Sequence, residues 1–263
     1  MLPGRTVLSL VEDRLPTKMP YHLSSVQLPA VNQLRPSMYS IIENNPAFVI
    51  VYKKPGVSFH CEQGIPGLFE TVKATEGFTE LYPVHRLDKI TSGLLVMAKT
   101  LAVNQALSAQ FAGRQVQKFY LAISAKKPKK KQGLIKGDME RTRRSAWKLS
   151  TTRANPAITQ FTSVALTEGR RLFLVKPHTG KTHQIRVALK SLGAPILGDT
   201  LYGDNNTLAD RAYLHAYALA FALDDRQYLF QALPQEGQSF LDDTFLTAVA
   251  SFHQPLHLIW PEV

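Results

Sequence analysis

Alternation between apolar and other side chains predicts several β-strands along the chain. The clearest case is residues 214–223, where His215, Tyr217 and every second residue up to Leu223 lie on one face. Residues 116–124 alternate in the same way and place Lys118 and Tyr120 on a common face. Apolar runs predict further strands at residues 48–52, 94–98, 157–166 and 171–175.

Apolar residues at helical spacing predict a helix over residues 101–114, because Val103, Leu107 and Phe111 recur at every fourth position. A second apolar stripe at helical spacing runs through residues 241–252. This pattern is typical of a helix that packs one face against a core, and it gives no sign of a partner site.

A further helix is predicted between Thr182 and Gly193. At 100° per residue, its apolar residues Ile185 and Leu189 share one face, which should pack on the core. Arg186 falls on the opposite face, in the first turns of the helix. A cation there is disfavoured by the helix dipole, so we expect an acid opposite it.

Two segments break these patterns. Residues 1–39 contain five prolines and no helical or strand period, which predicts a poorly ordered N-terminal extension before a domain over residues 40–263. A true beginning at Met38 is the alternative interpretation. Residues 126–148 carry ten Lys or Arg against two acids, or 10 − 2 = +8 of the net charge of +11. Like charges repel, so we expect a basic loop or insert there, which could still bind phosphates.

Composition then narrows the class of protein. With 263 residues, 44% hydrophobic and 19% charged, the chain is typical of a globular protein. Its net charge of +11 favours a polyanionic partner, nucleic acid before a membrane surface. The chain contains no run of about 18 apolar residues, so the sequence predicts no membrane span. The single cysteine, Cys61, allows no internal disulfide. We therefore expect a cytoplasmic location and, by default, a monomer.

Several familiar chemistries lack their motifs. The chain has no complete phosphate-binding loop, no Gly-x-Gly-x-x-Gly fingerprint, no His-Glu-x-x-His zinc helix and no Gly-x-Ser-x-Gly elbow. What remains is one carboxylate, Asp88, among basic residues and directly before the apolar run Leu94–Ala98. Charge placed directly before a buried strand is typical of the mouth of a cleft.

Residues 84–98 read V-H-R-L-D-K-I-T-S-G-L-L-V-M-A, which closely resembles the catalytic motif of the RNA pseudouridine synthases of the RluA family. Similar segments follow in the family's order over about residues 40–260. They are K-K-P-G at 53–56, K-F-Y-L-A at 118–122, P-H-T-G-K-T-H-Q-I-R-V at 177–187, the turn-rich residues 194–203, and L-H-A at 214–216. The departures are Lys53 where Asn is usual, Lys181 where Arg is usual, and Ala188 where His is common.

The resemblance implies an α+β fold. Its central sheet would be mixed but mostly antiparallel and split into two halves, with flanking helices and loops and an active-site cleft across the sheet. It also implies an enzyme that isomerises specific uridines to pseudouridine in structured RNA. The family acts on both ribosomal and transfer RNA, and we slightly favour ribosomal RNA as the substrate. This reaction uses no cofactor and no metal, and RNA is the expected partner.

The resemblance assigns roles to individual residues. Asp88 would be the catalytic residue, as nucleophile or as base, Tyr120 would stack on the uracil, and Arg186 would be the cation that keeps Asp88 ionised. Arg86 would help to displace the target base. The remaining predicted RNA-binding residues are His85, Lys118, His183, Lys129, Lys130 and Lys131.

Two other functions stay open at this point. The same fold could serve as a non-catalytic RNA-binding or ribosome-assembly factor, although the intact set of Asp88, Tyr120 and Arg186 argues against it. A nucleoside hydrolase or glycosylase could use the same carboxylate, and it would release free uracil.

The basic segment leads to a first prediction. Each phosphate neutralised on single-stranded RNA adds roughly 0.7 to the slope of log affinity against log salt. Replacing Lys129, Lys130 and Lys131 by Ser should flatten that slope by up to ~2 and weaken binding to all RNAs alike. Binding titrations at several salt concentrations measure the slope. An unchanged slope would mean that these lysines contact only solvent.

Overall fold

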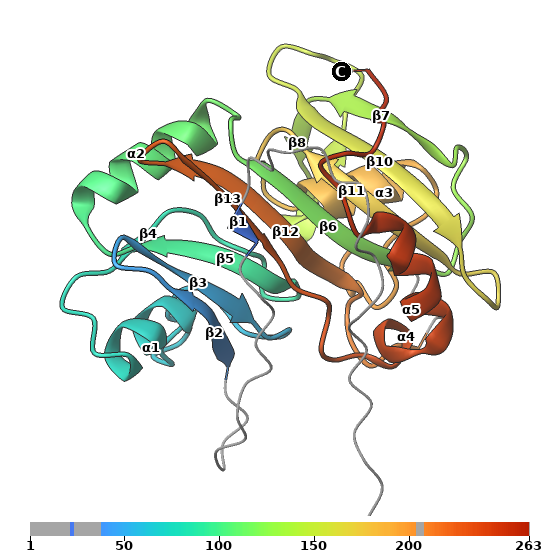
Figure 1. The fold of residues 1–263 in the computed structure, drawn as a ribbon. Helices are drawn as coiled ribbons and strands as arrows, with labels where there is room; N and C mark the ends of the chain where they lie inside the picture. The colour runs from blue at the N-terminus through green and yellow to red at the C-terminus, as the bar shows by residue number, and fades with distance from the viewer. Residues whose placement is uncertain (1–21, 24–37, 204–207, 263) are drawn as a thin grey trace, which may run out of the picture.

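The computed structural model describes residues 22–23, 38–203 and 208–262. Within these residues, eleven strands form one large sheet (Figure 1). Its strands in spatial order are β2 (Tyr39–Asn44), β3 (Phe48–Lys53), β5 (Ser92–Ala98), β12 (Leu214–Leu223), β6 (Gln117–Ser124), β11 (Arg171–Pro177), β10 (Ala157–Ala165) and β7 (Gln132–Gly137). Three further strands join it, namely β4 (Tyr82–Pro83) on β5, β13 (Arg226–Gln231) on β12, and β1 (His22–Leu23) on β13.

The described sheet is mixed but mostly antiparallel, since only β5–β12 and β1–β13 pair in parallel. The β5–β12 pairing, which we call the central junction, consists of His215 beside Ser92 and Ala216 beside Gly93. It joins a half with β2, β3 and β5 to a half with β6, β11, β10 and β7. The predicted α+β fold with a sheet in two halves is confirmed.

Gly93 makes the central junction possible. Its φ is +108°, and a Cβ atom at this position would overlap the backbone of Ala216 on the neighbouring strand. Any other residue would push β12 away from β5. The glycine of the segment T-S-G-L-L therefore allows the loop before β5 to reach the middle of the sheet.

The first half of the sheet is covered on both faces. The helices there are α1 (Leu68–Thr75) and α2 (Leu101–Ala112) (Figure 1). Leu107 of α2 packs in one cluster with Phe48, Ile50 and Tyr52, whereas Leu68 and Val72 of α1 pack with Val49 and Val51. Because successive residues of β3 point to opposite faces, this wholly buried strand is apolar from Phe48 to Tyr52 and ends in the buried Lys53.

The second half carries the helices α3 (Gln184–Ser191), α4 (Gln238–Leu241) and α5 (Asp243–Val249), and α5 continues into the 3₁₀-helix η2 (Ala250–Phe252) (Figure 1). Leu189 of α3, Phe240 of α4 and Phe245 of α5 pack in the core of this half. The three predicted helices are confirmed. None of the described helices combines the length and the apolar run needed to cross a bilayer.

The expectation of a loop over residues 126–148 is wrong for most of that segment. Strand β7 pairs with β10, and a separate hairpin consists of β8 (Met139–Arg141), the 3₁₀-helix η1 (Arg143–Ser145) and β9 (Trp147–Leu149). Pairing with β10 satisfies the backbone hydrogen bonds of β7 and buries the side chain of Ile135. These gains outweigh the repulsion between charged side chains, which can point to solvent. The amino-acid composition of the segment indicates the charge repulsion but not the strand pairing.

The predicted extension over residues 1–39 lies largely outside the described residues. Within it, His22 and Leu23 pair with β13, and Tyr39 already begins β2. Apart from β1, the strands of the large sheet and all described helices lie after residue 38, while residues 204–207 and 263 lie outside the described part. The domain over residues 40–263 stays a prediction.

His215 is fully buried at the central junction. Its Nε2 lies 2.7 Å from the carbonyl oxygen of Ala232, so Nε2 carries the proton and donates it. Its Nδ1 therefore accepts from the hydroxyl of Ser92 at 2.8 Å, and that hydroxyl oxygen accepts from Arg211 at 2.7 Å. Burial lowers the pKa of His215 to about 3. The imidazole is therefore neutral in the folded protein.

This gives a prediction for the pH dependence of stability. Between pH 6.5, the ordinary pKa, and about 3, the unfolded chain protonates His215 and the folded chain does not. Stability is therefore full above this range and lost as the pH falls, by up to ~1.4 kcal/mol per pH unit. Urea unfolding between pH 7 and 5 should show a shallower dependence for His215→Gln than for the wild type or for the exposed control His257→Gln. If the free energy of unfolding depends equally on pH in all three proteins, the neutral state of buried His215 is contradicted.

Candidate active site

Asp88 lies on the turn that enters β5, at the edge of a cavity of about 560 Å³. The buried side chain of Leu87 anchors this turn, and the backbone N–H of Thr91 donates to the carbonyl of Asp88 at 3.0 Å. The Asp88 carboxylate is 29% exposed, so it is accessible without being fully solvated. Other residues that line the cavity include Arg86, Arg114, Lys118, Tyr120, His178, Lys181, His183 and Arg186.

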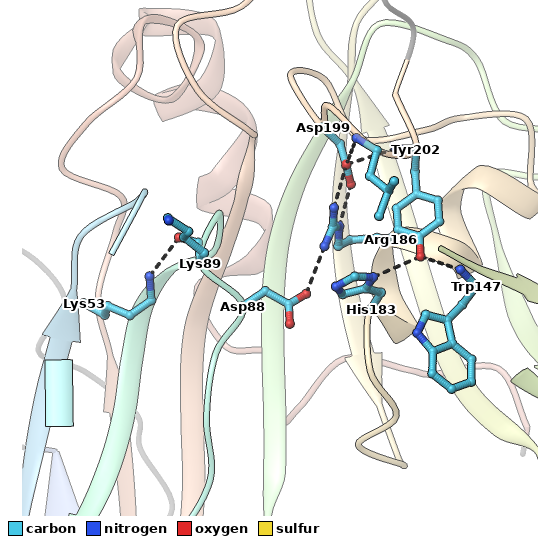
Figure 2. A network of polar contacts seen from close by, with 9 residues as sticks. Lys53, Asp88, Lys89, Trp147, His183, Arg186, Asp199 and Tyr202 are labelled. Carbon is cyan, nitrogen blue, oxygen red and sulfur yellow. Dashed lines mark hydrogen bonds and ion pairs between the residues drawn. The ribbon is translucent and has the colours of Figure 1, made fainter. Parts of the chain in front are cut away.

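Arg186 connects Asp88 to a buried acid. Its Nη1 lies 3.5 Å from Oδ2 of Asp88, and its Nε and Nη2 donate to the two carboxylate oxygens of Asp199 at 2.7 and 2.8 Å (Figure 2). Burial alone would lower the pKa of Arg186, but the hydrogen bonds and charge of Asp199, together with Asp88, raise it. The predicted pairing of Asp88 with Arg186 is confirmed.

Asp199 fixes the guanidinium from behind. Its side chain has no exposed area, and Oδ1 also accepts the backbone N–H groups of Leu201 and Tyr202 at 3.0 and 3.1 Å. Four donors thus satisfy a carboxylate that would be costly to bury alone. The two-point contact holds the plane of the Arg186 guanidinium and leaves Nη1 directed at Asp88.

Gln184 sets the start of α3 and therefore the position of Arg186. Its buried amide nitrogen donates to the carbonyl of Ile158 at 3.0 Å and to the hydroxyl of Thr159 at 2.9 Å. Its Oε1 accepts from the hydroxyl of Thr179 at 2.7 Å and the N–H of Lys181 at 3.0 Å. One side chain thereby ties the loop before α3 to β10.

His183 stands directly before α3 with a left-handed φ of +56°, which is uncommon for a residue other than glycine. Its Nδ1 lies 3.0 Å from the hydroxyl of Tyr202, which accepts the backbone N–H of Trp147 at 2.8 Å (Figure 2). Burial and the charge of Arg186 lower the pKa of His183. The β8–β9 hairpin is thus attached to the site through Tyr202.

Tyr120 and Lys118 project from β6 into the same cavity. Burial raises the pKa of Tyr120, and the nearby charge of Asp88 raises it further, so the phenol stays protonated. Burial lowers the pKa of Lys118, whose Nζ lies 5.3 Å from the ring centre of Phe111. The strand pairing Gly93–Ala216–Tyr120 brings this tyrosine beside the turn that carries Asp88.

The other predicted RNA-binding residues divide into two groups. Arg86 is exposed at the cavity, whereas His85 stacks on Phe111 and its Nε2 accepts the N–H of Val96 at 3.1 Å. Burial lowers the pKa of His85 to about 3, and Lys118 adds to this, which favours a neutral imidazole; contact of His85 with RNA stays a prediction. Lys129–Lys131 are exposed and do not line the cavity. Their contact with RNA stays a prediction.

Sequence reasoning missed Asp199, Tyr202 and Gln184. The available signal for Asp199 was an acid within an otherwise apolar, turn-rich stretch, residues 194–202. Nothing local indicates that Tyr202 joins a distant hairpin to α3. Among the described residues, no group of three or more His, Cys, Asp or Glu side chains could hold a metal ion.

Comparison with known proteins places these residues in a wider context. Residues 47–191 match the model of the RNA pseudouridylate synthase family. An uncharacterized RNA pseudouridine synthase of Haemophilus influenzae is 47% identical over 204 residues, 78% of this chain and 91% of the relative. Ribosomal large subunit pseudouridine synthase C of Rickettsia bellii is 36% identical over 149 residues, 55% of this chain and 50% of the relative.

The fold also matches a solved structure. Human RNA pseudouridylate synthase domain containing 1 superposes with a TM-score of 0.71 at 24% identity, over 88% of this chain and 100% of the other. This likeness concerns the fold, including the sheet on which Asp88 and Tyr120 are held.

The buried ion pair gives a prediction for stability. Asp199→Asn should lower the free energy of unfolding by on the order of 3–5 kcal/mol, because Arg186 remains buried without its main counter-charge. The matched control Glu140→Gln removes an exposed ion pair with Lys148, in which Glu140 is 45% exposed, and should cost far less because solvent screens the pair. Urea unfolding at neutral pH measures both. An equal loss in the free energy of unfolding in both variants would show that the buried Arg186–Asp199 pair is no more important for stability than an exposed pair.

Proposed function

Because this chain belongs to the RNA pseudouridylate synthase family, we propose that it isomerises specific uridines in structured RNA with Asp88 as its catalytic residue. Membership of this family makes the protein a pseudouridine synthase, which is an isomerase. The observation that carries the proposal is the partly exposed Asp88 carboxylate at the cavity, 3.5 Å from the buried guanidinium of Arg186.

The proposed reaction is an internal transfer. The bond between C1′ of the ribose and N1 of the uracil breaks, the uracil turns within the cavity, and C1′ bonds to C5. The proton on C5 leaves and N1 gains one, so the product has the atoms of the substrate. Asp88 acts at C1′ or takes the proton from C2′, and both roles need an ionised carboxylate. The guanidinium of Arg186 favours that form.

The cavity supports this chemistry in size and lining. Its volume of about 560 Å³ is in the range of small-molecule sites and can retain a detached base. The phenol ring of Tyr120 offers a surface on which uracil can stack. Because a base within an RNA helix hides its sugar bond, the target nucleotide must first be turned out of the stack. Exposed Arg86 at the cavity is the proposed group that helps to displace the target base.

The proposed substrate is ribosomal RNA in preference to transfer RNA. It is supported by the name of the Rickettsia relative, which refers to the large ribosomal subunit, whereas the net charge of +11 favours RNA of either kind. We further propose that the enzyme acts as a monomer in the cytoplasm. The single cysteine, Cys61, is consistent with a reducing compartment.

The first test removes the carboxylate. Asp88→Asn should abolish pseudouridine formation and leave folding and RNA affinity largely unchanged, because the amide can neither attack C1′ nor accept a proton. Carbodiimide mapping of ribosomal RNA transcripts after incubation with enzyme measures the product. A rate within about tenfold of the wild type, a barrier change of only ~1.4 kcal/mol, would remove Asp88 from the catalytic role.

Asp224→Asn is the matched control. Asp224 is exposed in the turn between β12 and β13 and has a φ of +50°, a conformation that Asn also adopts readily. It should retain full activity. The same reactions separate the alternative functions, since a glycosylase would release free uracil and a binding factor would retain RNA without changing it.

A further inference from the structure

Lys53, the last residue of β3, is fully buried beside the turn that carries Asp88. Its Nζ donates to three backbone carbonyls, those of Lys54 at 3.0 Å, Val57 at 2.8 Å and Lys89 at 3.1 Å. An ammonium group has three protons, so each has an acceptor. The side chain is therefore fixed and joins two segments more than thirty positions apart.

The bond to Lys89 acts on the carbonyl of the residue that directly follows Asp88. The same carbonyl also accepts the N–H of Gly56 at 2.9 Å, and the Thr91 N–H closes the turn on the carbonyl of Asp88. Pairing of Lys53 with Gly93 aligns β3 with the start of β5. The position of the Asp88 turn on the sheet thus depends on the hydrogen bond that the Lys53 ammonium group donates to the Lys89 carbonyl.

Lys53 also brings a charge to this place. Within the described part of the chain, it forms no ion pair, and Figure 2 shows Lys53 and Arg186 on opposite sides of Asp88. Burial and the positive charge of Arg211 lower the pKa of Lys53 to about 7, whereas the charge of Asp88 opposes this shift. In the motif that residues 53–56 resemble, a neutral Asn is usual at this position. The charge is therefore a feature of this chain.

We propose that Lys53 is a positioning residue for the isomerisation, which fixes the Asp88 turn against β3 and stabilises the Asp88 carboxylate as a second buried cation. Lys53 does not line the cavity, so it acts through Asp88 and not on the RNA. The inference rests on the proposed catalytic role of Asp88.

The test compares two variants. Lys53→Met removes both the N–H donors and the charge, whereas Lys53→Asn keeps two N–H donors on a shorter, uncharged side chain. Both should lower kcat, by about tenfold or more for Met and by less for Asn, with KM within about twofold of the wild type. Lys53→Asn keeps the test valid if the Met variant fails to fold. A kcat within twofold of the wild type in both variants, or a change in KM alone, would overturn the proposal.

Lys99→Asn is the matched control. Lys99 follows the opposite end of β5, donates to the side chain of Asn44, and lies 4.9 Å from the ring centre of Phe78. Its replacement should disturb local packing and leave kcat unchanged. If Lys99→Asn and Lys53→Asn lose equal melting temperature and equal kcat, the effect of Lys53 is structural only and the proposal fails.

The pH profile tests the charge. Wild-type kcat should fall as the pH rises from about 7 towards 9, because Lys53 loses its proton in that range, and this limb should be missing in Lys53→Asn. A flat wild-type profile, or a limb that persists in the variant, would overturn the role of the charge. A wild type that forms no pseudouridine would contradict the proposed function itself. Normal activity in the Lys53 variants, with an inactive Asp88→Asn, would contradict only this inference.

Discussion

The buried ion pair between Arg186 and Asp199 is the interaction on which the geometry of the site depends. Burial of two charges is costly, and here four hydrogen bonds to the Asp199 carboxylate and the ring of Tyr202, 4.9 Å from the guanidinium carbon, offset that cost. Two of the three guanidinium nitrogens are held by Asp199. The third, Nη1, can therefore reach only towards Asp88.

A second constraint is the short parallel pairing of β5 with β12. Because only two residue pairs join these strands, the turn before β5 opens at the middle of the sheet instead of at its edge. Ala216 then pairs with Tyr120 on its other side, so a phenol ring from the second half lies beside a carboxylate from the first. Neither half contains the complete site.

Two histidines near the central junction and the cavity lose their charge through burial. His85 and His215 are neutral because burial lowers the pKa of each to about 3, and each gives or accepts hydrogen bonds that hold β5 or β12 in place. The cations at Arg186 and Lys53 lie on opposite sides of Asp88 (Figure 2). His215 therefore serves the scaffold, and two buried side chains, Lys53 and Arg186, bring positive charge towards Asp88.

The sequence alone determined much of this protein. The alternation over residues 214–223 coincides with β12, and the spacing of Val103, Leu107 and Phe111 marks α2, because these periods follow directly from backbone geometry. The pairing of Asp88 with Arg186 was also predicted, because the helix dipole called for an acid near the cation and the resemblance to the family motif pointed to Asp88.

Other features were decided only by the tertiary structure. Residues 132–137, within the basic segment, form a strand because β10 supplies partners for their backbone, a contact that no local pattern encodes. Asp199 binds the guanidinium of Arg186, and Tyr202 accepts a hydrogen bond from Trp147 in a hairpin more than fifty positions earlier in the chain. Lys53 reads as part of a surface turn until its three carbonyl acceptors are seen. In each case the energy comes from burial and from partners distant in sequence, and both exist only once the chain has folded.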